Sequence, residues 1–140
     1  MSTQINTYLT FNGNCREAMM FYKECLGGAL TLQTVGESPL SEQLPATMKA
    51  CILHSILKKE ELVLMGTDLA GEQGLIKGNT VSLMLHCASE KEMNEYYHRL
   101  SKDGTAASPP QETHWGAFFG HLTDKFGNHW LLHCDKTALK

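Results

Sequence analysis

Two stretches of the chain show the apolar spacing of an amphipathic helix. In residues 15–26 the apolar positions share one helical face, and Asn14 with Glu17 forms a capping-box pattern at the start. Ser89 with Glu92 forms the same pattern ahead of a second periodic run that ends at residue 100. Glycines follow both runs, at 27–28 and at 104, as expected where a helix stops. The sequence therefore predicts two helices.

Extended apolar runs surround each helix. One run, 5–11 or 80–87, precedes each helix, and three strand candidates follow it, at 29–35, 50–57 and 61–67 in the first half and at 105–108, 116–123 and 129–133 in the second. The two halves repeat at an offset of 75 positions, which pairs Thr7, Leu9, Asn14 and Tyr22 with Ser82, Met84, Ser89 and Tyr97. This pattern predicts an α+β fold of two βαβββ modules.

The modules are expected at 1–70 and 78–140 of a single domain, 1–140, joined by a glycine-rich connector. The polar stretch 36–49 is too long for a tight turn and is predicted to be a loop that covers a pocket or packs on a partner. The histidine- and aromatic-rich stretch 114–130 is interpreted as the last two strands with a turn at 124–128, in which Asp124 binds nearby backbone N–H groups and Gly127 takes a positive φ.

Composition narrows the class of protein. The 140 residues are 42% hydrophobic and 19% charged, with a net charge of −3, which is typical of a soluble globular protein and gives no basic surface for nucleic acid. The sequence has neither a signal-peptide pattern nor an apolar run long enough to span a bilayer, so we expect no membrane association and a cytoplasmic location. The five cysteines are odd in number and form no C-x-x-C pair, which favours buried free thiols.

The segments YLTFNGNCREAMMFYKECLGG, QETHWGAFFGHLTDKFGNHW and ELVLMGTD resemble the PhnB-like (YjdN-like) branch of the vicinal oxygen chelate superfamily, which includes glyoxalases, bleomycin-resistance proteins and extradiol dioxygenases. The resemblance implies two modules that wrap curved sheets around a cavity, usually completed by pairing with a second chain or by the two modules of one chain. We expect a homodimer, because each curved sheet leaves an edge and an apolar face that a partner must cover. In metal-using relatives, the first and last strand of each module each supply one ligand to a divalent ion.

Carried over by the resemblance, those ligand positions fall on Thr7, Ser82, Leu64 or Met65, and Leu132 or His133. A catalytic divalent site needs about three nitrogen, oxygen or thiolate ligands, and only His133 is an ordinary donor here. We therefore expect no metal cofactor, and a cavity for a small organic ligand lined by Thr7, Leu9, Met65, Ser82, Met84, His86 and Trp115. The alternative is a displaced metal site of His86 and His133 with a cysteine such as Cys134.

Two residues are candidates for acid–base chemistry. His86 shares strand parity with Ser82 and Met84, so it would reach the cavity, where an imidazole can shuttle protons near neutral pH. Glu112 would suit this role if its loop closed over the cavity, although a surface glutamate is the simpler interpretation. Trp115 has two possible interpretations: its indole forms a wall of the ligand site, or it is a hydrophobic plug in the core.

Two functions stay open at this point. One is a PhnB-like, metal-independent protein that binds a small molecule of unknown identity; the other is a metal-dependent lyase, isomerase or dioxygenase with a non-standard ligand set. The sequence does not decide whether the protein is an enzyme. Proteins of this branch often carry the label demethylubiquinone methyltransferase, but no strand here leads through a glycine-rich turn into a helix. We therefore predict no S-adenosylmethionine binding.

Overall fold

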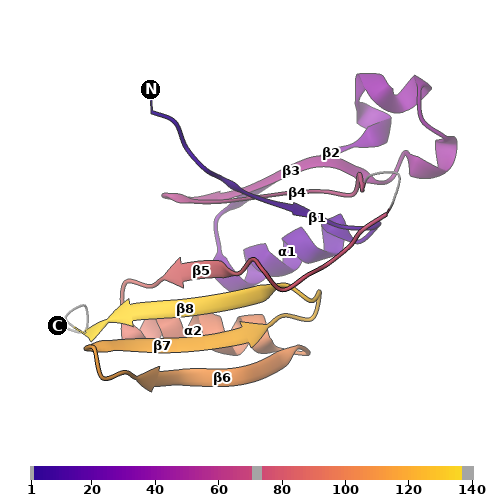
Figure 1. Cartoon of the computed structure of the whole chain (residues 1–140). Coiled ribbons are helices and arrows are strands. Elements are labelled where there is room, and N and C mark those ends of the chain that lie inside the picture. The colour runs from indigo at the N-terminus through magenta and orange to yellow at the C-terminus, as the bar shows by residue number, and fades with distance from the viewer. Residues whose placement is uncertain (1, 71–73, 137–140) are drawn as a thin grey trace. The chain divides into compact units, whose positions relative to one another are not determined.

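The computed structural model describes residues 2–70 and 74–136, which form two compact units, Met1–Lys77 and Gly78–Lys140. Each unit has one helix and one four-stranded sheet in the order βαβββ (Figure 1), which confirms the predicted α+β plan. The elements of the first unit are β1 (Thr7–Thr10), α1 (Cys15–Leu26), β2 (Ala29–Thr34), β3 (Ile52–Lys59) and β4 (Leu62–Thr67). Those of the second are β5 (Leu83–His86), α2 (Glu90–Ser101), β6 (Thr105–Glu112), β7 (Ala117–Thr123) and β8 (His129–Asp135).

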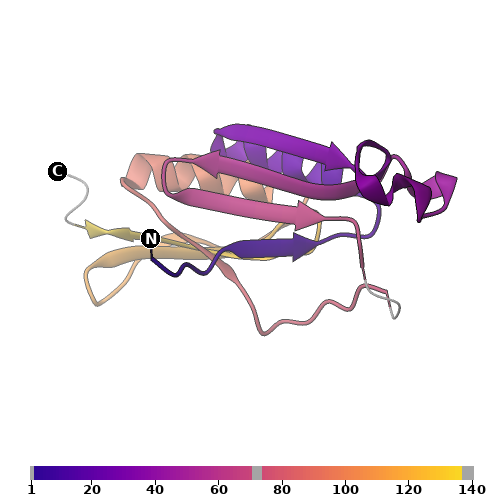
Figure 2. The same ribbon diagram turned by 90° about the horizontal axis from the view of Figure 1, so that it is seen from above.

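The two sheets have the same topology. Their strand orders are β1-β4-β3-β2 and β5-β8-β7-β6, and Figure 2 shows the strands of the first unit lying across the sheet in that order. The first strand of each unit pairs in parallel with the last, and the other pairs are antiparallel. The first and last strands of a unit are therefore neighbours, as the resemblance implied for the strands that carry site residues.

A helix fills one face of each sheet. Met19 and Tyr22 of α1 are fully buried, as are Leu57 and Leu64 of the sheet beneath them. Burying a side chain of this size contributes roughly 1.5–3 kcal/mol. Met93 and Leu100 of α2 are buried in the same way, among other apolar residues of the second unit. Each unit therefore has its own core on the helix side of its sheet.

The two helix N-termini are capped differently, which corrects one expectation. Ser89 accepts a hydrogen bond from the backbone N–H of Glu92 at 3.1 Å, as a capping residue does. Asn14 makes no side-chain capping bond. The carboxylate of Asp68 instead accepts the backbone N–H groups of Gly13 and Cys15, each at 2.9 Å. A buried acid from beyond β4 therefore stabilises the positive end of α1.

The predicted turn at 124–128 is confirmed. The buried Asp124 side chain accepts the backbone N–H groups of Phe126 and Asn128 and the indole N–H of Trp130, at 2.8–3.0 Å. Gly127 has a φ of 87°, which only glycine adopts without strain. The tryptophan is thereby fixed in the core by the turn that precedes its strand.

Two further predictions concern the end of α1 and the stretch 36–49. Glycines end α1 as predicted: Gly27 is its C-cap at a φ of 82°, and Gly28 follows at a φ of 101°, where a Cβ would lie 2.7 Å from the carbonyl oxygen of Lys58. The stretch 36–49, predicted to be a loop, contains short 3₁₀ turns, namely Val35–Glu37, Pro39–Glu42 and Ala46–Met48. Pro39 and Pro45 restrict this segment to tight local turns. Of the connector, residues 71–73 lie outside the described part of the chain.

The repeat offset needs a correction of one residue in the strands. The helices begin at Cys15 and Glu90, 75 positions apart as predicted, but β1 begins at Thr7 and β5 at Leu83, which are 76 apart. The connection from strand to helix is 11–14 in the first unit and 87–89 in the second, so it is one residue shorter. A shift of one residue moves a strand side chain to the opposite face of the sheet. Thr7 therefore corresponds to Leu83, and Tyr8 to Met84.

Across residues 2–70 and 74–136, no helix combines the length and the apolar character that a membrane crossing requires.

Candidate functional site

The second unit exposes the sheet face opposite α2. Leu83 pairs with Trp130, and Leu85 with Leu132; Trp130 and Leu132 are buried on the α2 side. Side chains alternate along a strand, so the residues between them point to the other face. These are the paired residues Met84 with Leu131 and His86 with His133. The structure thus places His133, and not Leu132, on the open face, and confirms that His86 shares this face with Met84.

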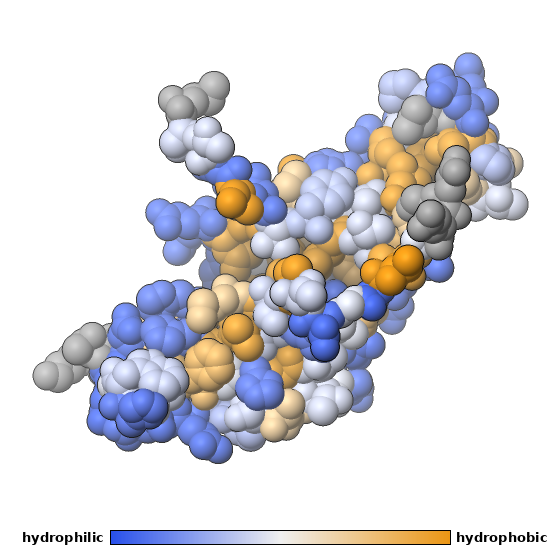
Figure 3. Space-filling model, viewed as in Figure 1, coloured by the Kyte–Doolittle hydropathy of each residue, from blue (hydrophilic) through white to orange (hydrophobic). Residues whose placement is uncertain are grey.

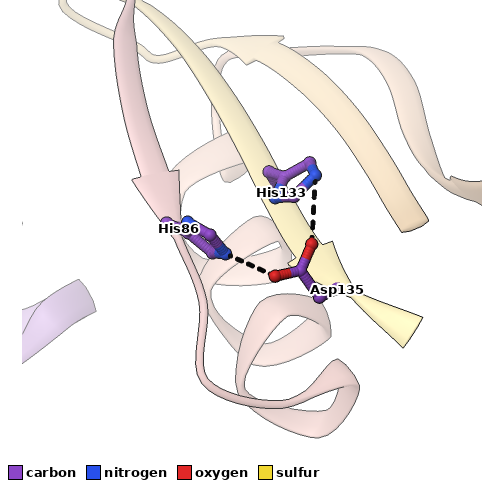
Figure 4. A group of neighbouring side chains, drawn as sticks. All are labelled: His86, His133 and Asp135. Atoms are coloured by element: carbon purple, nitrogen blue, oxygen red, sulfur yellow. Dashed lines mark hydrogen bonds and ion pairs between the residues drawn. The ribbon is translucent and has the colours of Figure 1, made fainter. Parts of the chain in front are cut away.

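Three polar side chains meet at one end of this open face (Figure 4). The Nε2 atom of His86 lies 3.3 Å from Oδ2 of Asp135, and Nε2 of His133 lies 3.7 Å from Oδ1 of the same carboxylate. One potential ligand atom from each residue lies within 4.8 Å of the other two. We call these three residues the His–His–Asp cluster.

Strand register explains why these side chains converge. His86 and His133 are Cα partners on neighbouring parallel strands, and Asp135 follows His133 by two positions, hence on the same face. The two imidazole rings contact edge to face with centroids 4.8 Å apart. The His133 side chain is 19% exposed, whereas those of His86 and Asp135 are more than half exposed. The cluster therefore has one anchored member and two accessible ones.

The neighbouring cationic side chain, that of Lys136, pairs outside the His–His–Asp cluster. Lys136 follows Asp135 in sequence, but its ammonium group forms an ion pair with Glu112 at the end of β6. The Glu112 side chain is half exposed in this pair and no loop buries it. Acid–base catalysis by Glu112 is predicted on the condition that its loop closes over a cavity, and the structure does not meet this condition. A paired surface carboxylate lacks the desolvation that such a role requires.

Trp115 lies in the turn between β6 and β7 and is 61% exposed. Its indole contacts the ring of His114 edge to face, with centroids 5.0 Å apart. Of the two interpretations given to this residue, a plug in the core does not agree with such exposure. As a member of a ligand site, Trp115 stays a prediction.

The predicted lining residues of the first unit divide between two faces. Thr7 and Leu9 pair with Leu64 and Gly66, whose face is covered by α1. A Cβ at Gly66 would lie 3.2–3.3 Å from Met19, Phe11 and Cys15. Met65 points to the opposite, open face, where its Cα partner is Tyr8.

The prediction that Thr7, Leu9 and Met65 line one surface therefore needs revision, because the one-residue slip in β1 puts Tyr8 there instead. The Tyr8 hydroxyl lies 3.4 Å from Nδ1 of His54 on β3. Ser82 precedes β5, and strand alternation assigns it to the side of Met84.

The positions that carry the metal in relatives do not form a usual ligand set. On the open faces they present Met65, Ser82 and His133, whereas Leu64 and Leu132 are buried against the helices. One imidazole, one hydroxyl and one thioether are a poor set for a hard or borderline divalent ion. The residues present therefore do not fit a metal at that position.

The cysteines beside the cluster do not serve it. Cys134 lies between His133 and Asp135 but points to the buried α2 side, and burial raises the pKa of its thiol. Burial, and to a lesser extent the charge of Glu92, likewise raises the pKa of the Cys87 thiol to about 12. The displaced site that combined His86 and His133 with Cys134 is thus corrected: strand alternation replaces the cysteine by Asp135.

Apolar side chains occupy the middle of the same open face. Met84 is 57% exposed, and its Cα partner Leu131 is partly exposed. On β7, the exposed His121 pairs with Leu131, and the partly exposed Phe119 pairs with His133. Figure 3 shows this face of the second unit, with orange apolar side chains exposed among blue polar ones. Phe118 pairs with the buried Cys134, so the two phenylalanines face opposite sides as predicted. The site thus combines an apolar centre with a polar end.

These features define a class before they define a family. Two βαβββ units with exposed sheet faces are the architecture of the glyoxalase, bleomycin-resistance and dioxygenase fold. The fold also appears in a glyoxalase-related enzyme from Fulvimarina pelagi, with a TM-score of 0.64 at 17% identity over 96% of this chain and 89% of that one.

Within that class, residues 3–133 match the family model described as 3-demethylubiquinone-9 3-methyltransferase, and the chain belongs to this family. It is 30% identical to the protein YjdN of Escherichia coli over 94% of this chain and 95% of that protein. It is also similar to the crystal structure of protein PA1353 from Pseudomonas aeruginosa, with 37% identity, a TM-score of 0.82, and coverage of 96% and 98% of the two chains. These similarities support the PhnB-like branch.

Sequence reasoning missed two residues of the open faces. Asp135 was not considered because the last strand was expected to end at His133, whereas β8 continues to Asp135. The alternation His133-x-Asp135 is the signal that would have found it. Tyr8 is missed because a single offset of 75 positions, applied to strands and helices alike, places Thr7 on the open face.

Proposed function

We propose that the chain binds a small organic molecule on the open face of the second unit, without a metal ion at the position used by metal-dependent relatives. The observation that carries the proposal is the exposed apolar centre formed by Met84, Leu131 and Phe119, next to the imidazoles of His86 and His133. Binding sites for small molecules typically combine apolar walls with a few polar groups that orient the ligand. The ligand we expect is apolar in its body and carries one polar or anionic group for the imidazole end.

Methyl transfer receives no support from the chain's own residues. The strand-to-helix connections 11–14 and 87–89 contain a single glycine, Gly13, and the backbone N–H groups of Gly13 and Cys15 are both bound by Asp68. A glycine-rich turn opening onto a free helix N-terminus, as nucleotide cofactors require, is not formed by these connections. We propose that the protein does not use S-adenosylmethionine, despite the description of its family.

A homodimer is part of this proposal. Each sheet has one face that its helix does not cover. The outer strands, β1 and β2 in the first unit and β5 and β6 in the second, each have one edge without a neighbouring strand in their own sheet. Exposed sheet edges and apolar faces favour association with a second copy, and twofold pairing closes such an assembly. Light scattering at micromolar concentration is expected to report twice the 15.6 kDa chain mass. The free thiols of all five cysteines agree with a reducing compartment such as the cytoplasm.

A thermal-shift screen of small organic compounds in the presence of EDTA tests the binding proposal. A ligand at 100 times its Kd stabilises the folded state by about 2.7 kcal/mol, which is well above the detection limit of such a screen. Met84→Asp should abolish the shift, because a carboxylate in the apolar centre opposes binding of an apolar ligand body.

Met20→Asp is the matched control, because Met20 is similarly exposed, at 54%, but lies on α1. Hits that shift the wild type and Met20→Asp but not Met84→Asp support the proposal. Hits that shift Met84→Asp as strongly as the wild type, or no hits from a broad library, contradict it.

A further inference from the structure

We infer that the His–His–Asp cluster is a binding site for a divalent transition-metal ion of the zinc, cobalt or nickel type. Of the positions that carry the metal in relatives, this site uses only His133; His86 and Asp135 lie outside them, and Met65 and Ser82, which do not fit a metal, are not part of the site. It uses the same two imidazoles that we propose for the polar end of the organic ligand, so binding of the ion is tested with no organic molecule present.

The donor set determines the class of ion. Two imidazole nitrogens and one carboxylate oxygen suit first-row transition ions, and three protein ligands leave positions open for water or a ligand. Magnesium and calcium prefer sites made of oxygen ligands and would bind this set weakly. Selection of the ion therefore follows from His86 and His133, and not from the charge of Asp135 alone.

The geometry is close to what such an ion requires. With bonds of about 2.0–2.2 Å in a tetrahedral arrangement, two ligand atoms on one ion lie roughly 3.3–3.6 Å apart. Each carboxylate oxygen lies close to that spacing from one Nε2 atom, at 3.3 Å and 3.7 Å, and all the potential ligand atoms lie within 4.8 Å of one another. Binding of an ion would draw these atoms closer together, and the exposed His86 side chain has room to move. The largely buried His133 holds the fixed end of the site.

The surroundings leave the carboxylate available. The ammonium group nearest in sequence, that of Lys136, is paired with Glu112. Exposure of His86 and Asp135 provides an entry path, which a metal site needs. The corresponding strand pair of the first unit carries Thr10 and Thr67, so the donors occur in one unit only.

Calorimetric titration of untagged, chelator-treated protein with ZnCl₂ tests the inference, with MgCl₂ as the comparison ion and cobalt absorption as a second readout. The wild type should bind one Zn²⁺ per chain, and the cobalt complex should show a ligand-field spectrum. His86→Ala and Asp135→Asn should each weaken binding more than about 100-fold, beyond the 10–100-fold typical of residues that only support a ligand. Both side chains are more than half exposed, so these variants should keep the fold, which circular dichroism checks.

His98→Ala is the matched control, because His98 is an exposed histidine in the last turn of α2, away from the cluster strands. It should bind zinc as the wild type does. Failure of the wild type to bind one equivalent more tightly than magnesium overturns the inference, as does unchanged binding in His86→Ala and Asp135→Asn. An equal loss in His98→Ala would show binding by surface histidines in general and would also overturn it. Ligand binding in EDTA is measured separately, so either proposal can fail without the other.

Discussion

The two units of the chain have the same topology but use the end of their first strand pair for different purposes. Where the second unit places His86 beside His133, the first unit places Thr10 beside Thr67. Just beyond these pairs, Asp68 is buried and binds three backbone N–H groups, whereas Asp135 is exposed and faces two imidazoles. Asp68 follows its strand pair by one position and Asp135 by two, so the carboxylates are not at equivalent positions: one is structural and the other belongs to a candidate site.

The difference shows how duplication separates stability from function. Asp68 connects the start of α1 with the start of β3, since its second oxygen accepts the backbone N–H of Ile52 at 2.8 Å. In the second unit the helix is capped by Ser89, and the last turn is held by Asp124. With these tasks assigned to other residues, the Asp135 carboxylate contacts only the imidazoles of His86 and His133 among the contacts described.

The largest expected effect comes from removing the two carboxylates in turn. Asp68→Ala leaves three backbone N–H groups without their acceptor, so we expect the free energy of unfolding to fall by about 3 kcal/mol or more. Asp135→Ala should change it by less than about 0.5 kcal/mol, as for most exposed positions. Urea denaturation of both variants measures the difference. Equal destabilisation would remove the distinction between a structural and a functional aspartate.

Alkaline pH should destabilise both units through their buried thiols. Burial raises the pKa of Cys15 from 9.0 to about 11 and that of Cys87 from 9.0 to about 12. The folded state then retains protons that the unfolded chain has lost, so stability is fully present below about pH 9 and falls as the pH rises towards 11 and 12.

The urea midpoint of the wild type should decrease as the pH rises from about 8 to about 11. Cys15→Ala and Cys87→Ala should each make the decrease shallower, whatever their stability at neutral pH. A slope that neither substitution alters would show that other groups, such as the Tyr97 hydroxyl, whose pKa burial also raises, cause the loss.

The helix caps provide the smallest contrast. Ser89→Ala should lower the free energy of unfolding by about 1 kcal/mol, because it removes the bond to the N–H of Glu92. Asn14→Ala should cost less than about 0.5 kcal/mol, because Asn14 makes no capping bond and Asp68 binds the first N–H of α1. Equal costs would mean that Asn14 caps α1 in solution.

Much of the fold was predictable because periodicity and caps are local signals. The element order, the turn at Asp124 and the end of α1 at Gly27–Gly28 all follow from residues close in sequence. The strand faces were harder, because the connection before α2 is one residue shorter than that before α1, and one residue reverses the face. The role of Asp68 depends on partners 16–55 positions away, which no local pattern indicates. The role of Asp135 depends on His86, 49 positions away, as well as on His133 in the same strand.

Binding of an organic ligand on the open face of the second unit is most directly tested by nuclear magnetic resonance of ¹³C-methyl-labelled methionines during titration with a screening hit in EDTA. The Met84 methyl signal should shift progressively to saturation, because this side chain lies in the exposed apolar centre. Met19 of α1 and Met93 of α2, both fully buried, should stay unchanged and serve as internal references. A titration that shifts the exposed Met20 of α1 and leaves Met84 unmoved would contradict the account.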